Sequence, residues 1–136
     1  CMQKFLTKSL LAGSILLALN FIGLYITMFL FPSIAEQYFS PTFDMSGYKG
    51  ILFLFHPFVL SFALAWFWLR FKDQLSGSIW VKGVELGLVY GAIAVLPSMW
   101  MILSAFDVTP ALVITWFIHG VLQGTIVGII YAKINP

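Results

Sequence analysis

Two glycine-bearing segments decide the fold: residues 83–91 read GVELGLVYG, and residues 120–128 read GVLQGTIVG. In each segment a glycine recurs at every fourth residue, so the glycines share one face of a helix. Small residues on such a face let two membrane helices approach closely, and close packing is the main source of helix contact in lipid. The two segments therefore predict a tight helix pair that packs through Gly83, Gly87, Gly91, Gly120, Gly124 and Gly128.

The glycines also have the spacing of an antiparallel hairpin. Residues at matched depth in such a hairpin have position numbers with a constant sum, and three glycine pairs share one sum: Gly83 with Gly128, Gly87 with Gly124, and Gly91 with Gly120. Helices joined by a short loop are usually neighbours. Two alternatives stay open: one ridge forms a contact between copies of the chain, or the glycines only reflect the general abundance of glycine in membrane helices.

The composition around these segments is that of an integral membrane protein. Of 136 residues, 61% are hydrophobic and 9% are charged, whereas soluble domains carry about 25% charged residues. A membrane-spanning helix needs about 20 mainly apolar residues, and four stretches qualify, at about 7–31, 50–71, 79–105 and 109–132. The chain is thus expected to be a single domain, an all-α bundle of four transmembrane helices in antiparallel up-down order.

The N-terminal residues need a comparison with a signal peptide. Lys4 and Lys8 precede an apolar run, but this run is longer than the roughly 7–15 residues of a signal sequence, so we expect a retained helix. Cys1 precedes Met2, which resembles a native start, and we interpret Cys1 as an added residue; a lipid-bearing cysteine is the alternative. With one cysteine, a disulfide framework is excluded.

The basic residues indicate the orientation in the membrane. Six of the seven fall on one side of the four-span arrangement, and only Lys49 falls on the other. Because cytoplasmic loops are enriched in Lys and Arg, both termini are predicted to be cytoplasmic, and the small size favours a prokaryotic inner membrane. The formal net charge of +2 is too small for a nucleic-acid partner. The six residues are Lys4, Lys8, Arg70, Lys72, Lys82 and Lys133.

The connections carry local helix signals. Ser33 and Glu36 have the spacing of a capping box, which predicts a short interfacial helix in the first outer loop; an irregular loop is the alternative. Pro97 is expected to kink the third span, because proline removes an amide and crowds the preceding turn. Thr109 and Pro110 are a typical N-cap and first-turn pair, so the fourth helix should begin there.

A few polar residues fall deep inside the predicted spans. At about 1.5 Å per residue, Asn20, Ser61 and His119 lie roughly 15 Å below the outer surface, which predicts one midplane layer. On the fourth helix a polar stripe faces away from the glycines and toward the first or second helix. Four other residues of this helix are expected to face lipid: Val121, Ile118, Thr125 and Ile114. The candidate ligand or ion site is therefore Asn20, Ser61, Thr115, His119 and Gln123. The alternative is that these residues only form hydrogen bonds between helices.

Two other sets of ionisable residues are weaker candidates. Glu85 lies about two turns inside the third span and is expected to pair with Lys82 or Arg70, with proton or cation coupling as the alternative. His56 and His119 suggest a bis-histidine haem protein as a minor possibility, although their expected depths differ and no C-x-x-C-H motif is present. We therefore predict no cofactor and no other metal site.

Function is less determined than fold. The sequence holds no metalloprotease, nucleophile-elbow, P-loop or dinucleotide motif, so an enzyme is not favoured. The first hypothesis is a non-enzymatic membrane protein, an accessory subunit of a larger complex or a homo-oligomer, that binds lipid or partner helices. The alternative is a small transporter, channel or ligand-binding bundle that uses Asn20, His119 and Gln123. An open cavity that reaches His119 would favour the second hypothesis, and a dry, tightly packed centre the first.

Overall fold

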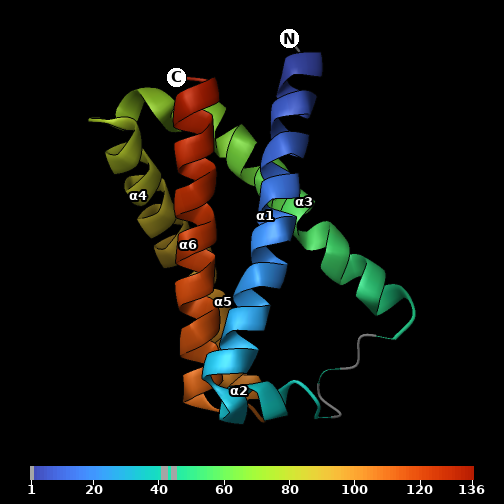
Figure 1. Cartoon of the computed structure of the whole chain (residues 1–136). Coiled ribbons are helices and arrows are strands. Elements are labelled where there is room, and N and C mark those ends of the chain that lie inside the picture. The colour runs from blue at the N-terminus through green and yellow to red at the C-terminus, as the bar shows by residue number, and fades with distance from the viewer. Residues whose placement is uncertain (1, 41–42, 44–45) are drawn as a thin grey trace.

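The computed structural model describes residues 2–40, 43 and 46–136, so the interpretation of Cys1 lies outside the described residues. The described residues form helices and connections without any strand. Figure 1 shows their arrangement. The elements are α1 (Met2–Leu30), α2 (Pro32–Gln37), α3 (Tyr48–Phe71), the short 3₁₀ helix η1 (Lys72–Gln74), α4 (Ile79–Tyr90), the π-helical turn η2 (Gly91–Val95), α5 (Leu96–Ala105) and α6 (Pro110–Ile134).

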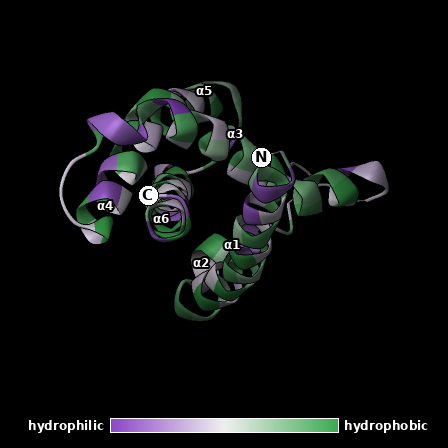
Figure 2. Ribbon diagram, turned by 90° about the horizontal axis from the view of Figure 1, so that it is seen from above, coloured by the Kyte–Doolittle hydropathy of each residue, from purple (hydrophilic) through white to green (hydrophobic). Residues whose placement is uncertain are grey.

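Four helical stretches are long and apolar enough to cross a membrane, which confirms the predicted all-α bundle of four spans. They are Met2–Leu30, Tyr48–Gln74, Ile79–Ala105 and Pro110–Ile134. Successive spans run in opposite directions, and both termini lie at the same end of the bundle (Figure 1). Viewed along the bundle, hydrophobic residues cover the outward faces of the helices (Figure 2), as expected where the solvent is lipid rather than water.

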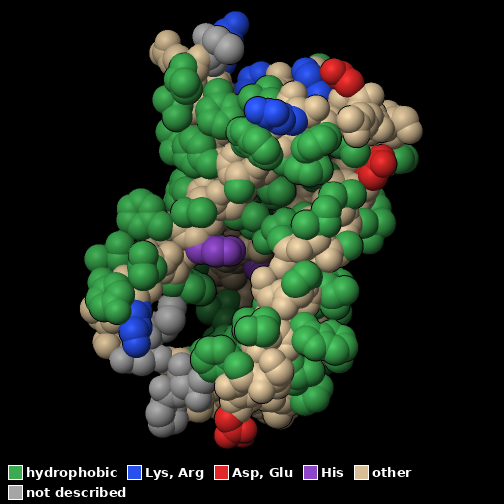
Figure 3. All heavy atoms as spheres, turned by 180° about the vertical axis from the view of Figure 1, so that it is seen from behind, with side chains coloured by type: hydrophobic (Ala, Val, Ile, Leu, Met, Phe, Trp, Pro, Cys, Tyr) green, Lys and Arg blue, Asp and Glu red, His purple; other side chains and the backbone are tan. Residues whose placement is uncertain are grey.

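The two ends of the bundle differ in charge. Lys and Arg gather at the end where both termini lie, and only one is seen near the other end (Figure 3). We call the first the basic end and the second the α2 end, because α2 lies there (Figure 1).

The helix pair α4–α6 is the closest contact in the molecule. A Cβ atom added to Gly128 would lie 2.8 Å from Gly83 Cα, and one added to Gly124 would lie 3.1 Å from Gly87 Cα. Only glycine at these positions lets the two backbones touch, and such close approach stabilises helix pairs in lipid. The glycine-lined hairpin is therefore confirmed, with two of its three glycine pairs in the predicted register.

The third predicted pair, Gly91 with Gly120, does not form. A Cβ atom on Gly91 would meet the Val121 side chain at 2.6 Å, and one on Gly120 would meet the Val95 side chain at 2.9 Å. Each of these glycines thus accommodates a valine of the opposite helix instead of another glycine. The backbones separate toward the α2 end, because a side chain now stands between them.

The π-helical turn η2 explains this change of register. A π turn inserts one residue into the helical repeat and rotates every position that follows it. Pro97 is the second residue after the turn, where its ring would otherwise crowd a carbonyl group of the preceding α-helical turn. The expected effect of Pro97 on the third span thus takes the form of a π turn, and as a result Val95 is buried while Ala94 and Ser98 are exposed.

The contact surface of α6 is wider than its glycine ridge. A Cβ atom on Gly87 would lie 2.8 Å from both Thr125 N and Val121 O. Val121 and Thr125 are half-buried, so the prediction that they face lipid is wrong, whereas Ile114 and Ile118 are exposed as predicted. The approach of the two helices is so close that positions flanking the ridge are covered as well.

The helices α1 and α3 cross at an oblique angle (Figure 1). At the crossing, a Cβ atom on Gly13 would lie 2.6 Å from Phe58 Cδ1. On the basic-end side of this crossing, α3 joins the core, whose members include Ala12, Leu16, Leu60, Leu64, Trp68, Leu86, Val127 and Tyr131. On the other side, residues 51–56 are all exposed, and this half of α3 leaves the bundle (Figure 2).

The predicted short helix in the first outer loop is present as α2, but the capping box is not. The N-cap residue is Phe31 and makes no side-chain hydrogen bond, and Pro32 occupies the first turn. Ser33 therefore lies inside the helix, two positions after the N-cap residue. Proline suits this place, because the amide it lacks would have no partner there. The expected cap at Thr109 is confirmed, since its side chain accepts a hydrogen bond from Leu112 N.

Aromatic and polar contacts tie α2 to the start of α6. Trp116 Nε1 donates a hydrogen bond to the Tyr38 hydroxyl at 2.6 Å, and Phe43 packs edge-on against the Trp116 ring. Gln37 Oε1 accepts hydrogen bonds from the Thr109 amide and hydroxyl. Burial raises the pKa of Tyr38, and the hydrogen bond from Trp116 partly offsets this. This end of α6 is thereby fixed against the loop that follows α1.

Candidate functional site

Three polar side chains meet between α1 and α6 at membrane depth. Asn20 Oδ1 accepts a hydrogen bond from Gln123 Nε2 at 2.6 Å and lies 2.8 Å from His119 Nε2. Asn20 and His119 are half-buried, and Gln123 is buried. The polar stripe of α6 thus faces α1, one of the two helices that its position predicts. We call Asn20, His119 and Gln123 the polar triad.

The hydrogen-bond pattern fixes the chemical roles within the triad. A carboxamide oxygen only accepts hydrogen bonds, so both His119 Nε2 and Gln123 Nε2 donate to Asn20 Oδ1. A neutral histidine that donates through Nε2 keeps an acceptor lone pair on Nδ1. The triad therefore has three further groups that its internal bonds leave free: Asn20 Nδ2 as a donor, with His119 Nδ1 and Gln123 Oε1 as acceptors.

These three atoms make no hydrogen bond within the described residues. Among those residues, the one fully buried side-chain polar atom without a partner is Ser9 Oγ. The free atoms of the triad are consequently not sealed inside protein, since each retains some accessible surface. An unpaired polar group is costly in an apolar medium, so these atoms form a set of unmet hydrogen-bonding positions that face a space.

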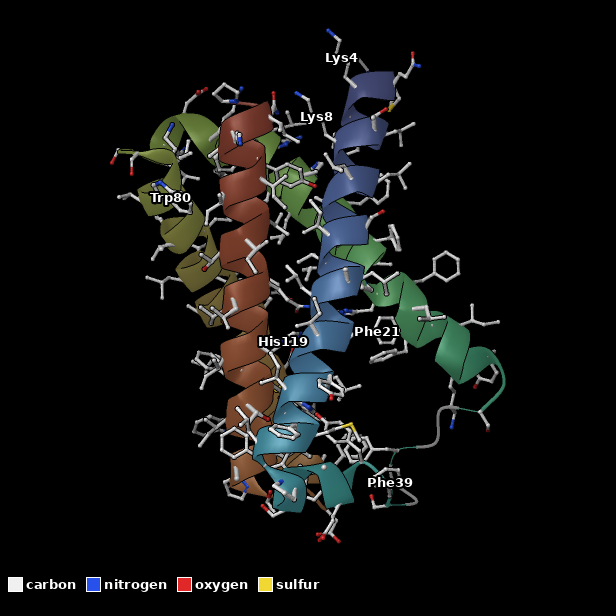
Figure 4. All side chains as sticks on the ribbon, in the orientation of Figure 1. Lys4, Lys8, Phe21, Phe39, Trp80 and His119 are labelled. Atoms are coloured by element: carbon white, nitrogen blue, oxygen red, sulfur yellow. The ribbon has the colours of Figure 1, made fainter. Side chains whose placement is uncertain are left out.

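The molecule is hollowed on this side. Figure 3 shows a depression between two lobes of the molecule, and the two histidines lie next to each other at it. Figure 4 shows His119 projecting from α6 on the side of α1. The hollow exists because α3 crosses α1 obliquely, so that its Tyr48 half does not cover the triad. The hollow lies on the side of the bundle, between its basic end and its α2 end (Figure 3).

Gly23 lies next to the histidine ring. A Cβ atom on Gly23 would lie 3.4 Å from His119 Cε1 and 3.5 Å from His119 Nδ1, which are ordinary contact distances. The glycine sits one turn after Asn20 on the same face of α1. The imidazole therefore lies close to α1 at Gly23 while its Nε2 reaches Asn20.

Two residues of the predicted midplane site are not part of the triad. Ser61 is buried closer to the basic end, where its hydroxyl donates to Ser9 O at 2.6 Å. Ser9 precedes Asn20 by 11 positions, or about 16 Å along α1. The depth estimate failed for Ser61 because α3 is oblique, so its rise per residue is not all depth. Thr115 donates to Leu112 O in its own helix and does not reach Asn20.

The expected ion pair of Glu85 is not formed. In the part of the chain that the structure describes, Glu85 has no salt bridge with Lys82 or Arg70. Arg70 instead lies over the Trp66 ring, with 4.9 Å between its guanidinium carbon and the ring centroid. This cation–π contact lets the long Arg side chain stay at the basic end above its own helix.

His56 lies closer to His119 than the residue spacing along the two helices suggests, again because α3 is oblique (Figure 3). His56 is exposed, and His119 Nε2 is already engaged by Asn20. A haem held by both histidines would need the remaining nitrogen of His119 or the loss of its bond to Asn20. The bis-histidine haem therefore stays a minor alternative to the predicted absence of a cofactor, and an absorption spectrum with or without a Soret band tests it.

A second polar cluster was missed in the sequence. Tyr131 OH donates to Ser61 O at 2.8 Å and lies 2.8 Å from Ser61 Oγ. Together with the bond from Ser61 to Ser9 O, this network joins α1, α3 and α6 inside the core. Ser61 was expected beside Asn20, whereas Ser9 and Tyr131 looked like ordinary helix positions, and only the crossing of three helices brings them together.

Comparison of the chain with protein-family models, with curated proteins and with solved structures gave no match.

Proposed function

We propose that this small polytopic membrane protein binds an uncharged, lipid-soluble molecule in the hollow beside the polar triad. The observation that carries the proposal is the set of three free hydrogen-bonding atoms on Asn20, His119 and Gln123. They offer a donor and two acceptors at one place. A hydroxyl or a primary amide, which both donates and accepts, matches such a set.

The surroundings favour a ligand without charge. The hydrogen bonds of the triad run between its own members, and no Lys, Arg, Asp or Glu takes part in them. A charged ligand at membrane depth would require an opposite charge beside it, because unpaired charges are very costly in hydrocarbon. A transporter or channel of the kind considered from the sequence would use this same site.

A photoreactive alcohol tests the proposal. The protein is reconstituted in phosphatidylcholine vesicles with a diazirine derivative of hexadecanol, irradiated, and digested for mass spectrometry. Labelling should concentrate on peptides that contain Asn20 or His119, and excess hexadecanol should suppress it. Labelling spread evenly over all lipid-facing helices would contradict the proposal.

Near-isosteric variants separate binding from packing. Gln123→Met and His119→Phe keep side-chain volume but remove a free acceptor, so each should reduce specific labelling several-fold, about the effect of one lost hydrogen bond of roughly 1 kcal/mol. Thr115→Val is the matched control: it changes a polar residue of the same stripe, whose hydroxyl serves only its own helix. Circular dichroism and gel filtration confirm folding. Equal labelling of Gln123→Met, His119→Phe and Thr115→Val would overturn the proposed role of the triad.

A second candidate is an accessory subunit or homo-oligomer, and one observation favours it. Residues 51–56 of α3 are exposed on every side of the helix, so no described part of the chain covers this half-helix. A helix from a second copy or from a larger membrane complex fits there as well as lipid does. Light scattering of the detergent-solubilised protein distinguishes these cases: a mass of one chain contradicts the homo-oligomer.

The proposed orientation follows from charge. Six of the seven basic residues are on the side of the chain ends in the four-span order, so we propose that the basic end faces the cytoplasm of a prokaryotic inner membrane. A protease applied to intact spheroplasts should not reach an epitope fused after Pro136. Cleavage of the epitope without cell lysis would reverse the orientation.

A further inference from the structure

A cleft at the basic end is separate from the polar triad. It has a volume of about 170 Å³ and lies between α1, α3 and α6. Its lining includes Lys4, Lys8 and Ser9 from α1, Trp68 from α3, and Tyr131 and Asn135 from the end of α6. The lining contains two cations and no carboxylate side chain, so the cleft is suited to an anion.

Both lysines are unpaired. Lys4 and Lys8 are four residues apart and therefore lie on one face of α1, and both project at the basic end (Figure 4). Neither makes an ion pair or a hydrogen bond to another described residue. By contrast, Lys72 at the same end donates to a main-chain oxygen of Pro136 at 2.7 Å. The cleft thus collects positive charge that the protein itself does not neutralise.

Ser9 supplies an independent signal. The other serine and threonine side chains of α1 each donate to a carbonyl of their own helix, namely Thr7, Ser14 and Thr27. Ser9 is fully buried, and its Oγ has no hydrogen-bond partner. A buried polar atom without a partner is destabilising, and Ser9 lines the cleft. A bound acceptor would supply the missing partner.

We propose that this cleft binds the phosphate group of an anionic phospholipid, with Lys4 and Lys8 balancing its charge and Ser9 and Asn135 donating hydrogen bonds. Phosphate oxygens are strong acceptors for such donors, and basic pockets between membrane helices on the cytoplasmic side are suited to anionic headgroups. A lipid is favoured over free phosphate because apolar surface adjoins the cations: Phe5 and Leu69 also line the cleft. Leu69 is half-exposed and can contact an acyl chain.

Native mass spectrometry with defined lipids tests the proposal. The detergent-solubilised protein is mixed with equal amounts of phosphatidylglycerol and phosphatidylcholine, and the bound lipid is measured. Phosphatidylglycerol should be retained preferentially. The double variant Lys4→Gln/Lys8→Gln should lose about tenfold or more of this preference, since each lysine near a headgroup contributes about 1 kcal/mol.

The matched control removes the same charge elsewhere at that end. Lys82→Gln/Lys133→Gln alters two lysines that do not line the cleft, so it should keep most of the preference. Equal losses in the two double variants would reduce the effect to general attraction and overturn the proposal. Ser9→Ala changes no charge and should weaken phosphatidylglycerol retention about threefold, the effect of one modest hydrogen bond; retention as in the unmodified chain would also contradict the site.

An arm with inorganic phosphate separates the two possible sources. If the site recognises a lipid, millimolar inorganic phosphate should leave phosphatidylglycerol bound, because the acyl chains add contacts that the free ion lacks. Complete displacement of the lipid by inorganic phosphate would assign the cleft to the free ion and contradict the proposal.

Discussion

The two contact surfaces of α6 solve the problem of helix association in opposite ways. Toward α4, the backbones touch at Gly83–Gly128 and Gly87–Gly124, and the Thr125 hydroxyl within this contact donates to Val121 O of its own helix rather than across the contact. Toward α1, the contact is held by the bonds of Gln123 and His119 to Asn20, and part of each polar group remains unpaired. The first surface contains no polar atom that needs a further partner, whereas the second contains polar atoms that can bind a ligand.

In a small membrane bundle, a functional site is therefore expected at a hydrogen-bonded helix contact rather than at a glycine contact. A contact made by backbone approach depends on the small volume of its side chains and tolerates almost no added atom. A contact made by side-chain hydrogen bonds depends on chemistry, and the bonds are individually weak, about 0.6 kcal/mol on average. Three predictions probe this contrast, and they are ordered by the size of the expected effect.

The largest effect is expected for Gly87→Leu. A Cβ atom at this position already lies 2.8 Å from backbone atoms of α6, which cannot move aside as a flexible side chain does. Overpacking commonly costs about 1–3 kcal/mol and sometimes more, and four added carbons at a backbone contact should prevent stable folding. Gel filtration in mild detergent should show loss of the monodisperse species.

The control for this variant adds bulk on the same helix without touching α6. Val84 is 49% exposed on the outward side of α4, so Val84→Leu should elute and melt like the unmodified chain. A Gly87→Leu protein that also remains monodisperse with an unchanged melting temperature would refute close backbone contact as the basis of the α4–α6 pair.

An intermediate effect is expected for Asn20→Leu. The shared acceptor disappears, so both bonds to Asn20 Oδ1 are lost and the buried Gln123 amide keeps no partner. At about 0.6 kcal/mol per bond, with a further penalty for the unpaired amide, the loss should be about 1–2 kcal/mol. Unfolding in a titration with sodium dodecyl sulfate measures it.

Ser14→Ala is the matched change on the same helix. Its hydroxyl donates to Leu10 O within α1, so its removal should leave the unfolding midpoint nearly unchanged. If Asn20→Leu unfolds at the same midpoint as Ser14→Ala, the triad does not hold α1 against α6, and the contrast between the two surfaces of α6 fails.

The sequence predicted the glycine hairpin and most of the triad for a common reason. Helical phase and depth are reliable for helices that run nearly along the bundle, and this applies to α1 and α6. Asn20, His119 and Gln123 were therefore identified together, and so were the pairs of Gly83 and Gly87 with α6. In these helices, the position of a residue along the helix gives both the depth of its side chain in the membrane and the direction in which that side chain points.

The predictions failed where the position along a helix no longer gives the depth and the direction of a side chain. Ser61 lies on the oblique helix α3. Residue counting placed it at the depth of Asn20, whereas it lies closer to the basic end, beside Ser9. Gly120 lies opposite the π turn. This turn adds one residue to the helical repeat and so changes which residues face α6, and Pro97 downstream is the only local sequence signal for it. The network of Ser61 with Tyr131 requires three helices to cross, and no periodicity within one helix contains that information.

The smallest effect on stability is expected for Gly23→Ala, which probes the open side of the triad. Its Cβ atom would contact the His119 ring at 3.4 Å, an ordinary distance, and alanine is favoured over glycine inside a helix by about 1 kcal/mol. The unfolding midpoint should therefore stay the same or rise slightly. Gly13→Ala, ten residues earlier on the same helix, should lower it, because its Cβ atom would lie 2.6 Å from Phe58 Cδ1.

The same substitution also bears on the ligand. The added methyl group would lie 3.5 Å from His119 Nδ1, the free acceptor of the ring, and should hinder a hydroxyl group from reaching it. Gly23→Ala should thus combine unchanged stability with reduced labelling by the photoreactive alcohol, an outcome that a purely structural triad does not produce. Unchanged labelling in a protein of unchanged stability would show that Nδ1 does not take part in binding, and it would confine the triad to its role in holding α1 against α6.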